Sequence, residues 1–293
     1  MRLSIDVSHP SYPRRLLELE PFELRVEGTL PTGLGVAIVG TRNATDDALR
    51  FARRLAAQLA EQGLVIWSGG ALGIDSAAHR GALDAQKPTV AVLGSGLDCL
   101  FPKENEALFR DVVEAGGALA SIVDDREQAA RHHFFRRNRV LAGATEMTIV
   151  VECDVRSGAR NAAGHAHDIG RPIGVVLQGP WLACGAGGYL EYQQHGAHVI
   201  QGYQDVLKLL GLDQKQLTLD LDAPPRDKLS DLERSVVRAV GEGRDNLDEL
   251  CEALSLPAAS VCAVVMDLTL RGHLLETPRG LRPATSTGKR APP

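Results

Sequence analysis

Two phenylalanines followed by a dense group of arginines stand near the middle of the chain. Residues 132–143 have the sequence HHFFRRNRVLAG, in which Phe134 precedes Arg136, Arg137 and Arg139. A single-stranded nucleic acid presents phosphates to arginine and exposed base faces to aromatic rings. The stretch therefore holds both side-chain types that such a ligand needs. A solvated helix face is the alternative, because charge runs commonly have that role.

Four glycine-containing loops each follow a short apolar run. They are residues 40–45 (GTRNAT), 68–75 (SGGALGID), 94–98 (GSGLD) and 152–164 (ECDVRSGARNAAG). In an open parallel sheet, such loops meet at one edge, and the helices that follow point their N-termini at a ligand there. Glycine also lets backbone N–H groups approach an anion closely, which predicts a phosphate-binding edge. Doubly wound folds need glycine at these turns in any case, so one loop alone is weak support.

The candidate nucleic-acid-binding residues come from these loops and from the arginine-rich stretch. They are Gly40, Thr41, Arg42, Ser68, Gly69, Gly70, Phe134, Arg136, Arg137, Asn138, Arg139, Ser157, Gly158 and Arg160, with Arg131 as a further candidate. One of the two adjacent phenylalanines is expected to face inward, and Phe134 is expected to be the ring that stacks on a base. Residues 137–139 are expected to open a helix or turn, whose backbone N–H groups would add to the contacts.

Alternating strands and helices must position these loops. Apolar runs predict strands at 36–40, 64–70, 89–94, 118–123, 147–152 and 172–178, and helical patterns lie at 46–62, 75–85, 104–116 and 161–170. Strands that are apolar at nearly every position imply a parallel sheet covered on both faces. The prediction is a doubly wound α/β domain with a mostly parallel sheet over residues 35–211.

The remaining segments have simpler predictions. Residues 1–34 form a lead-in segment, and residues 212–228, with their prolines and charges, form a linker. Residues 229–283 carry three short helical patterns and a strand-turn-strand pattern, which suggest a small winged-helix domain. The last helical pattern has Arg271 as its one cation, so we expect this domain to contact another protein or the partner subunit, and not duplex DNA. Residues 284–293 are expected to be a disordered tail.

Composition excludes several classes of protein. The 293 residues carry a net charge of −5, so nucleic-acid binding must come from a local cationic patch. No apolar run reaches membrane-spanning length, and the N-terminus lacks the apolar stretch of a signal peptide. The five cysteines form no C-x-x-C pair. We therefore expect a reduced, cytoplasmic protein that does not associate with membranes.

No catalytic residue, metal site or cofactor is predicted. The loops match neither the P-loop nor G-x-G-x-x-G, and the chain has neither a nucleophile elbow nor H-E-x-x-H. The histidine pairs His165/His167 and His195/His198 lack clustered cysteine or carboxylate partners, which favours surface or core roles over metal binding.

Five motifs in order resemble those of the DNA processing protein A family (DprA, also called Smf). They are GTR (40–42), SGGALGIDSAAHRGAL (68–83), GSGLDCLFPKENEAL (94–108), FFRRNRVLAG (134–143) and VVECDVRSGARNAAGHAHDIGR (150–171). The resemblance implies an extended Rossmann-like core that binds single-stranded DNA without being an enzyme. It also implies a homodimer that protects incoming DNA and loads RecA recombinase onto it during natural transformation.

The resemblance is that of a divergent member. Phe135 stands where the family has proline, Ile122 where a glutamate is common and Ala162 where it has threonine, while residues 187–197 keep little of a later motif. We also expect this chain to lack the helical domain that precedes the lead-in segment in many relatives.

Two other functions stay open from the residues alone. LOG-type nucleoside-monophosphate phosphoribohydrolases share the superfamily, but their P-G-G-x-G-T-x-x-E string is absent, and the lone Glu152 is weak support for that chemistry. A nucleotide-sensing module that keeps a pocket for a small phosphate ligand is the third possibility.

Overall fold

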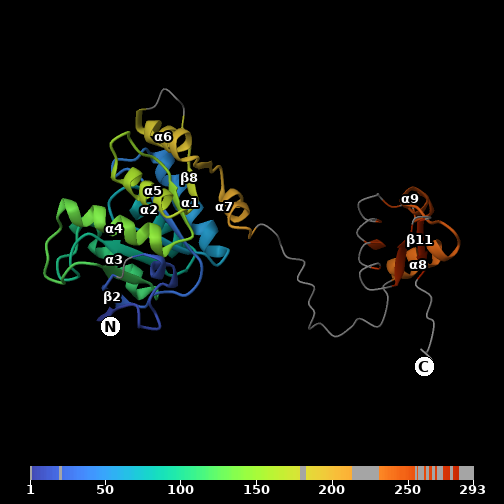
Figure 1. Cartoon of the computed structure of the whole chain (residues 1–293), viewed down its shortest axis with the longest axis horizontal. Helices are drawn as coiled ribbons and strands as arrows, with labels where there is room; N and C mark the ends of the chain where they lie inside the picture. The colour runs from blue at the N-terminus through green and yellow to red at the C-terminus, as the bar shows by residue number, and fades with distance from the viewer. Residues whose placement is uncertain are drawn as a thin grey trace. The chain divides into compact units, whose positions relative to one another are not determined.

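The computed structural model separates into two compact units, Met1–Lys215 and Gln216–Pro293 (Figure 1). It describes residues 2–19, 22–178, 183–212, 231–254, 256, 261, 264–265, 268, 273–277 and 280–283. Each unit has a hydrophobic core of its own. Among the described residues, no helix is long and apolar enough to cross a membrane.

A nine-stranded sheet forms the centre of the first unit, in the order β1-β2-β6-β5-β4-β3-β7-β8-β9. The strands are β1 (Arg2–Ile5), β2 (Leu24–Gly28), β3 (Gly35–Val39), β4 (Val65–Ser68), β5 (Thr89–Leu93), β6 (Ala118–Ser121), β7 (Met147–Val150), β8 (Ile173–Val175) and β9 (His198–Val199). All neighbours from β6 to β9 pair in parallel, whereas β2 is antiparallel to both β1 and β6. This confirms the predicted doubly wound, mostly parallel sheet.

Helices cover both faces of this sheet. They are α1 (Asp46–Glu61), α2 (Ile74–Asp84), α3 (Glu106–Glu114), α4 (Arg131–Ala144), α5 (Gly158–Asp168), α6 (Ala186–His195) and α7 (Tyr203–Leu209), with short 3-10 turns η1 (Arg14–Glu18), η2 (Lys103–Asn105) and η3 (Ala183–Gly185). Successive strand residues point to opposite faces. In β3, Val36 and Ile38 therefore pack with α1 and α2, while Ala37 and Val39 belong to the core that includes α4 and α5.

Side-chain caps decide where two of these helices begin. Thr45 accepts a hydrogen bond from the Ala48 amide at 3.3 Å, which starts α1 at Asp46 as predicted. Ser157 accepts from the Ala159 amide at 3.1 Å, and α5 therefore begins at Gly158. The predicted start at residue 161 was late, because an apolar pattern reveals packing and does not reveal the cap.

Residues 1–34 are an integral part of the first unit. Strands β1 and β2 extend the sheet beyond β6, and Leu16 and Leu24 are fully buried in the core. The Tyr12 hydroxyl accepts a hydrogen bond from the Phe22 amide at 3.2 Å. The lead-in segment predicted from the sequence therefore has no structural boundary at residue 34.

The second unit contains helices α8 (Asp231–Gly241) and α9 (Leu247–Leu254) and the antiparallel hairpin β10 (Leu274–Thr277) and β11 (Gly280–Pro283). Val236, Leu250 and Leu274 are among the residues of its core. These elements agree with the predicted winged-helix domain. Arg271, most of the third helical pattern, residues 213–228 of the linker and the tail 284–293 lie outside the described residues.

Candidate nucleic-acid interface

Two cavities that share lining residues lie where the loops after β3 and β7 meet α4. Their volumes are about 820 Å³ and about 350 Å³. The residues that line both are Arg42, Phe134, Asn138, Arg156, Ser157 and Gly158. Strand β3 is the point from which the sheet order runs outward in both directions, and ligands of open α/β sheets bind at such a switch point.

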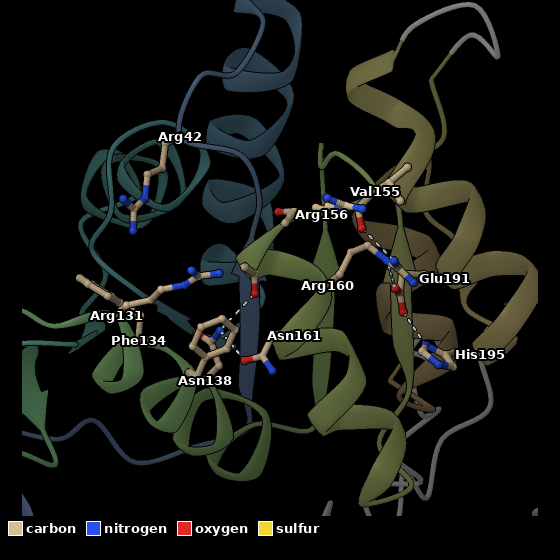
Figure 2. A pocket seen from close by; sticks show the side chains of 13 residues that line it. Arg42, Arg131, Phe134, Asn138, Val155, Arg156, Arg160, Asn161, Glu191 and His195 are labelled. Atoms are coloured by element: carbon tan, nitrogen blue, oxygen red, sulfur yellow. Dashed lines mark hydrogen bonds and ion pairs between the residues drawn. The ribbon is translucent and has the colours of Figure 1, made fainter.

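The larger cavity is lined by arginines from different parts of the fold. Figure 2 shows Arg42, Arg131 and Phe134 on one side of it and Arg160, Glu191 and His195 on the other. The remaining lining residues are Phe135, Asn138, Val155, Arg156, Ser157, Gly158 and Asn161. The Asn138 amide donates to the Gly158 carbonyl at 3.1 Å and to Asn161 Oδ1 at 3.0 Å, which ties α4 to the start of α5.

Arginine side chains lie over both phenylalanines of α4. The Arg42 guanidinium carbon is 5.3 Å from the centroid of the Phe134 ring, and that of Arg131 is 5.8 Å from the Phe135 ring, within the range of cation–π contacts. Phe134 is half-buried against Gly94, where an added Cβ would be 2.6 Å from the ring. Phe135 is 41% exposed, so Phe134 is the ring that faces inward. The sequence had led us to expect Phe134 to be the ring that stacks on a base. Both rings nevertheless line the larger cavity.

Three arginines of this cavity have guanidinium groups that are not engaged in an ion pair with any described carboxylate. Within the described residues, Arg42, Arg131 and Arg156 form no ion pair. Arg156 stands next to the predicted Ser157, and only its position beside the α5 cap could have revealed it in the sequence. The charge of Arg42 also acts on the buried Asp75, but no ion pair among the described residues occupies any of the three guanidinium groups, so each can bind an anion.

The charge of Arg160 is already balanced by a buried carboxylate. Arg160 Nε lies 2.6 Å from Glu191 Oε1, and His195 Nδ1 lies 2.6 Å from the other oxygen of Glu191. Glu191 is fully buried. Glu191 was not singled out in the sequence, and His195 was given only a surface or core role, because a carboxylate and a histidine four residues apart on a helix have no distinctive pattern.

Arg137 is buried and does not project into solvent. It is 5% exposed and donates from Nη1 to the Val92 carbonyl at 2.7 Å. Burial lowers the pKa of Arg137 to about 10, although the charge of Asp75 opposes this change. Burial also raises the pKa of Asp75, and the charge of Arg137 opposes that rise. Arg137 therefore lines the smaller cavity as a desolvated cation that supports the loop beneath it.

The glycine-rich loop after β4 lies beneath this arginine. A Cβ on Gly69 would be 1.6 Å from Arg137 Nη1, so only glycine leaves room for the guanidinium. The Ser68 hydroxyl donates to the Ile38 carbonyl at 2.6 Å and is fully buried. Ser68, Gly69 and Gly70 were predicted to bind the ligand, but none of them lines either cavity.

Helix α4 separates the arginines that the sequence places together. With 3.6 residues per turn, Asn138 and Arg137 share the face of Phe134, whereas Arg136 and Arg139 point elsewhere. Arg139 lies 5.8 Å from the Phe22 ring and lines a different cavity, and the exposed Arg136 lines neither of the two described above. The expectation that residues 137–139 open a helix was wrong, because α4 begins at Arg131 and its backbone hydrogen bonds use those amides.

The first loop, which contains Gly40, Thr41 and Arg42, is held by Glu152. The Thr41 amide donates to the Glu152 carbonyl at 2.6 Å, and the Thr45 amide donates to Glu152 Oε2 at 3.0 Å. Glu152 is 2% exposed and lines neither cavity. It positions the loop that carries Arg42. In the part of the chain that the structure describes, no group of three or more His, Cys, Asp or Glu side chains could hold a metal ion.

Comparisons with known proteins match both units. The profile of the family described as DNA recombination-mediator protein A matches residues 4–211, and that of the DprA winged helix domain matches residues 221–280. A Mycobacterium tuberculosis relative described as DNA processing protein DprA is 37% identical over 239 residues, which cover 80% of this chain and 61% of that relative. This chain thus spans less than two thirds of the length of that relative.

Two solved structures share the fold. The X-ray structure of DprA from Streptococcus pneumoniae has a TM-score of 0.64 and 32% identity, covering 70% of this chain and 73% of that one. A Helicobacter pylori DprA structure, reported for its single-stranded DNA binding mode, has a TM-score of 0.63 and 28% identity, covering 72% of this chain and 96% of that one. Together with the profile matches to both units, these likenesses show that the chain belongs to the DNA processing protein A (DprA/Smf) family.

Proposed function

We propose that this protein binds single-stranded DNA in the groove formed by the two cavities. The observation that carries the proposal is a set of three arginines, Arg42, Arg131 and Arg156, which form no ion pair within the described residues and line a cavity with the rings of Phe134 and Phe135. Guanidinium groups bind phosphates, and aromatic rings stack on any of the bases, whatever the nucleotide sequence. A single strand needs both within one short reach, and this groove provides them on a chain of net charge −5.

The predicted contact residues contribute to this groove in different ways. Arg42, Phe134, Asn138, Ser157 and Gly158 line both cavities, while Gly40 and Thr41 line the smaller one. The helix α5 starts at this wall, so its N-terminal amides can add to phosphate binding. The likeness to the Helicobacter pylori DprA structure, which was reported for its single-stranded DNA binding mode, supports the same conclusion.

We further propose that the protein acts on incoming DNA in the cytoplasm, as a homodimer that loads RecA recombinase. Membership of the family supports this part of the proposal. Sedimentation equilibrium of the full chain measures the mass of the assembly. Co-sedimentation of RecA with this protein, in the presence and absence of oligo-dT, tests whether RecA is a partner. A monomer at micromolar concentration, or RecA that stays in the supernatant, would refute the corresponding part.

Fluorescence anisotropy of labelled oligo-dT measures the main activity. We expect unlabelled oligo-dT to displace the probe efficiently and a duplex of equal length to displace it poorly, because paired bases hide their faces from the rings. AMP is a second competitor, and chromatography of the same mixture reports any release of adenine. Tight AMP binding without DNA binding would favour a nucleotide sensor, and adenine release would favour a phosphoribohydrolase.

A further inference from the structure

Exposed phenylalanine rings gather at one place in this protein. Of the six phenylalanines, Phe109 is fully buried, while Phe101 and Phe135 are each 41% exposed. Phe135 follows Phe134 in the sequence, and the ring centroid of Phe101 is 6.0 Å from that of Phe134, with an angle of 59° between the planes. The Phe101 ring therefore stands next to the half-buried Phe134 ring, and Phe135 lines the larger cavity together with Phe134.

Phe101 belongs to a loop that the surrounding structure holds in place. The Gly96 amide donates to the Glu127 carbonyl at 2.8 Å, and the Asp98 amide donates to the Asp125 carbonyl at 2.8 Å. Arg2 Nη2 also donates to the Leu97 carbonyl at 3.1 Å. The segment just before Phe101 is thus ordered before any ligand arrives. A ligand that uses this ring would lose little free energy in ordering it.

The position of Phe101 continues the groove. Phe134 lines both cavities and carries the Arg42 guanidinium at 5.3 Å, whereas Phe101 lines neither cavity and contacts Phe134 from outside. Neighbouring bases of a stacked strand are about 3.4 Å apart. The 6.0 Å between the two ring centroids exceeds this spacing, and the rings are tilted by 59°. They therefore suit two consecutive bases of an extended strand that are not stacked on each other, each packed on its own ring.

We propose that Phe101 is a further stacking residue, which binds one nucleotide of single-stranded DNA beyond the two cavities. The proposal rests on the function proposed above. It assigns to the loop after β5 a role in setting the length of strand that the protein covers. The groove would then hold the strand by phosphate contacts at Arg42 and by base contacts that extend past Phe134.

The test uses the full chain with Phe101→Ala, Phe101→Tyr and, as a matched control, Leu34→Ala. Leu34 is 42% exposed and directly precedes β3, at the opposite end of the strand from the loop of Arg42. The dissociation constant is measured by anisotropy on a ladder of oligo-dT lengths. For long oligonucleotides, Phe101→Ala should raise it about fivefold or more, which corresponds to about 1 kcal/mol for one lost stack. Phe101→Tyr keeps a ring and should restore wild-type affinity.

Length dependence distinguishes stacking from a general defect. The shortest oligonucleotide that reaches full affinity should be about one nucleotide shorter for Phe101→Ala than for wild type, and Leu34→Ala should match wild type throughout. Equal loss of affinity at every length, or no loss at any length, would overturn the role of Phe101 while leaving the function proposed for the groove intact. Failure of the wild type to bind any oligonucleotide would refute that function. Thermal unfolding of each variant verifies that it is folded.

Discussion

Replacing Arg42 by alanine should weaken the salt dependence of DNA binding by a calculable amount. A protein that neutralises phosphates of a single strand releases about 0.7 counterions per phosphate, and the logarithm of affinity falls in proportion with the logarithm of salt. The larger cavity is lined by three arginines, Arg42, Arg131 and Arg156, that form no ion pair with any residue the structure describes. If each contacts one phosphate, the slope for wild type is about −2.1, and it becomes about −1.4 without Arg42.

These slopes give a measurable contrast. Between about 50 mM and about 200 mM salt, the affinity of wild type should fall about 18-fold and that of Arg42→Ala about 7-fold. Anisotropy titrations of one labelled oligo-dT at four or more salt concentrations give both values. Binding by Arg42→Ala should also be weaker at each concentration, because a phosphate contact and the cation over Phe134 are lost together.

Two further arginine variants make the reasoning refutable. Arg136→Ala removes an equal charge from an exposed side chain that lines neither cavity, so its slope should equal that of wild type. Arg160→Gln should change the slope by less than half as much as Arg42→Ala, because Glu191 already balances that charge at 2.6 Å. If Arg136→Ala reduced the slope as much as Arg42→Ala, the strand would not follow the groove.

Three other substitutions test the supporting structure. Gly94→Ala places a Cβ 2.6 Å from the Phe134 ring, so it should lower the free energy of unfolding, measured in urea, by about 1–3 kcal/mol. It should also weaken oligo-dT binding. Wild-type values in both assays would contradict this packing. Glu191→Gln leaves the charge of Arg160 unbalanced and should lower the free energy of unfolding by about 1–3 kcal/mol, and an unchanged urea midpoint would rule this out. Burial lowers the pKa of His79 from 6.5 to about 3. Below pH 6.5, His79 therefore becomes protonated in the unfolded chain but stays neutral in the folded chain. Between about pH 6 and pH 4, this difference alone should lower the free energy of unfolding by about 1.4 kcal/mol per pH unit. Urea unfolding of His79→Gln over this range should lack that part of the slope, and equal slopes would show that His79 is protonated in the folded state.

Much of the fold could be predicted because its signals are local. The helix predicted at 46–62 is observed as Asp46–Glu61, since the apolar period and the Thr45 cap both lie within the segment itself. The strands of the parallel core were recognised because burial on both faces makes nearly every position apolar. The sheet strands within residues 1–34 were not predicted, because their pairing depends on β6, far along the chain.

The sequence predicted the candidate site and several of the residues that line it, but it could not show which arginines face the cavity. The loops of Arg42 and Ser157 were identified, and the structure brings both to the same two cavities. Of the arginines at positions 136, 137 and 139, by contrast, none projects freely into the larger cavity. A sequence shows that three cations are adjacent, but the turn of the helix decides which of them share a face.

The sequence by itself determined the alternation of strands and helices, the glycine-containing loops and the family, because these depend on order and spacing along the chain. Only the tertiary structure decided which charges are available to a ligand. Arg137 is buried against Val92, 45 positions away, and Arg160 is paired with Glu191, 31 positions away. Glu152 holds the loop of Arg42 through Thr45, at a separation of 107 positions. Burial and pairing depend on such distant contacts, and a pattern of neighbouring residues does not contain them.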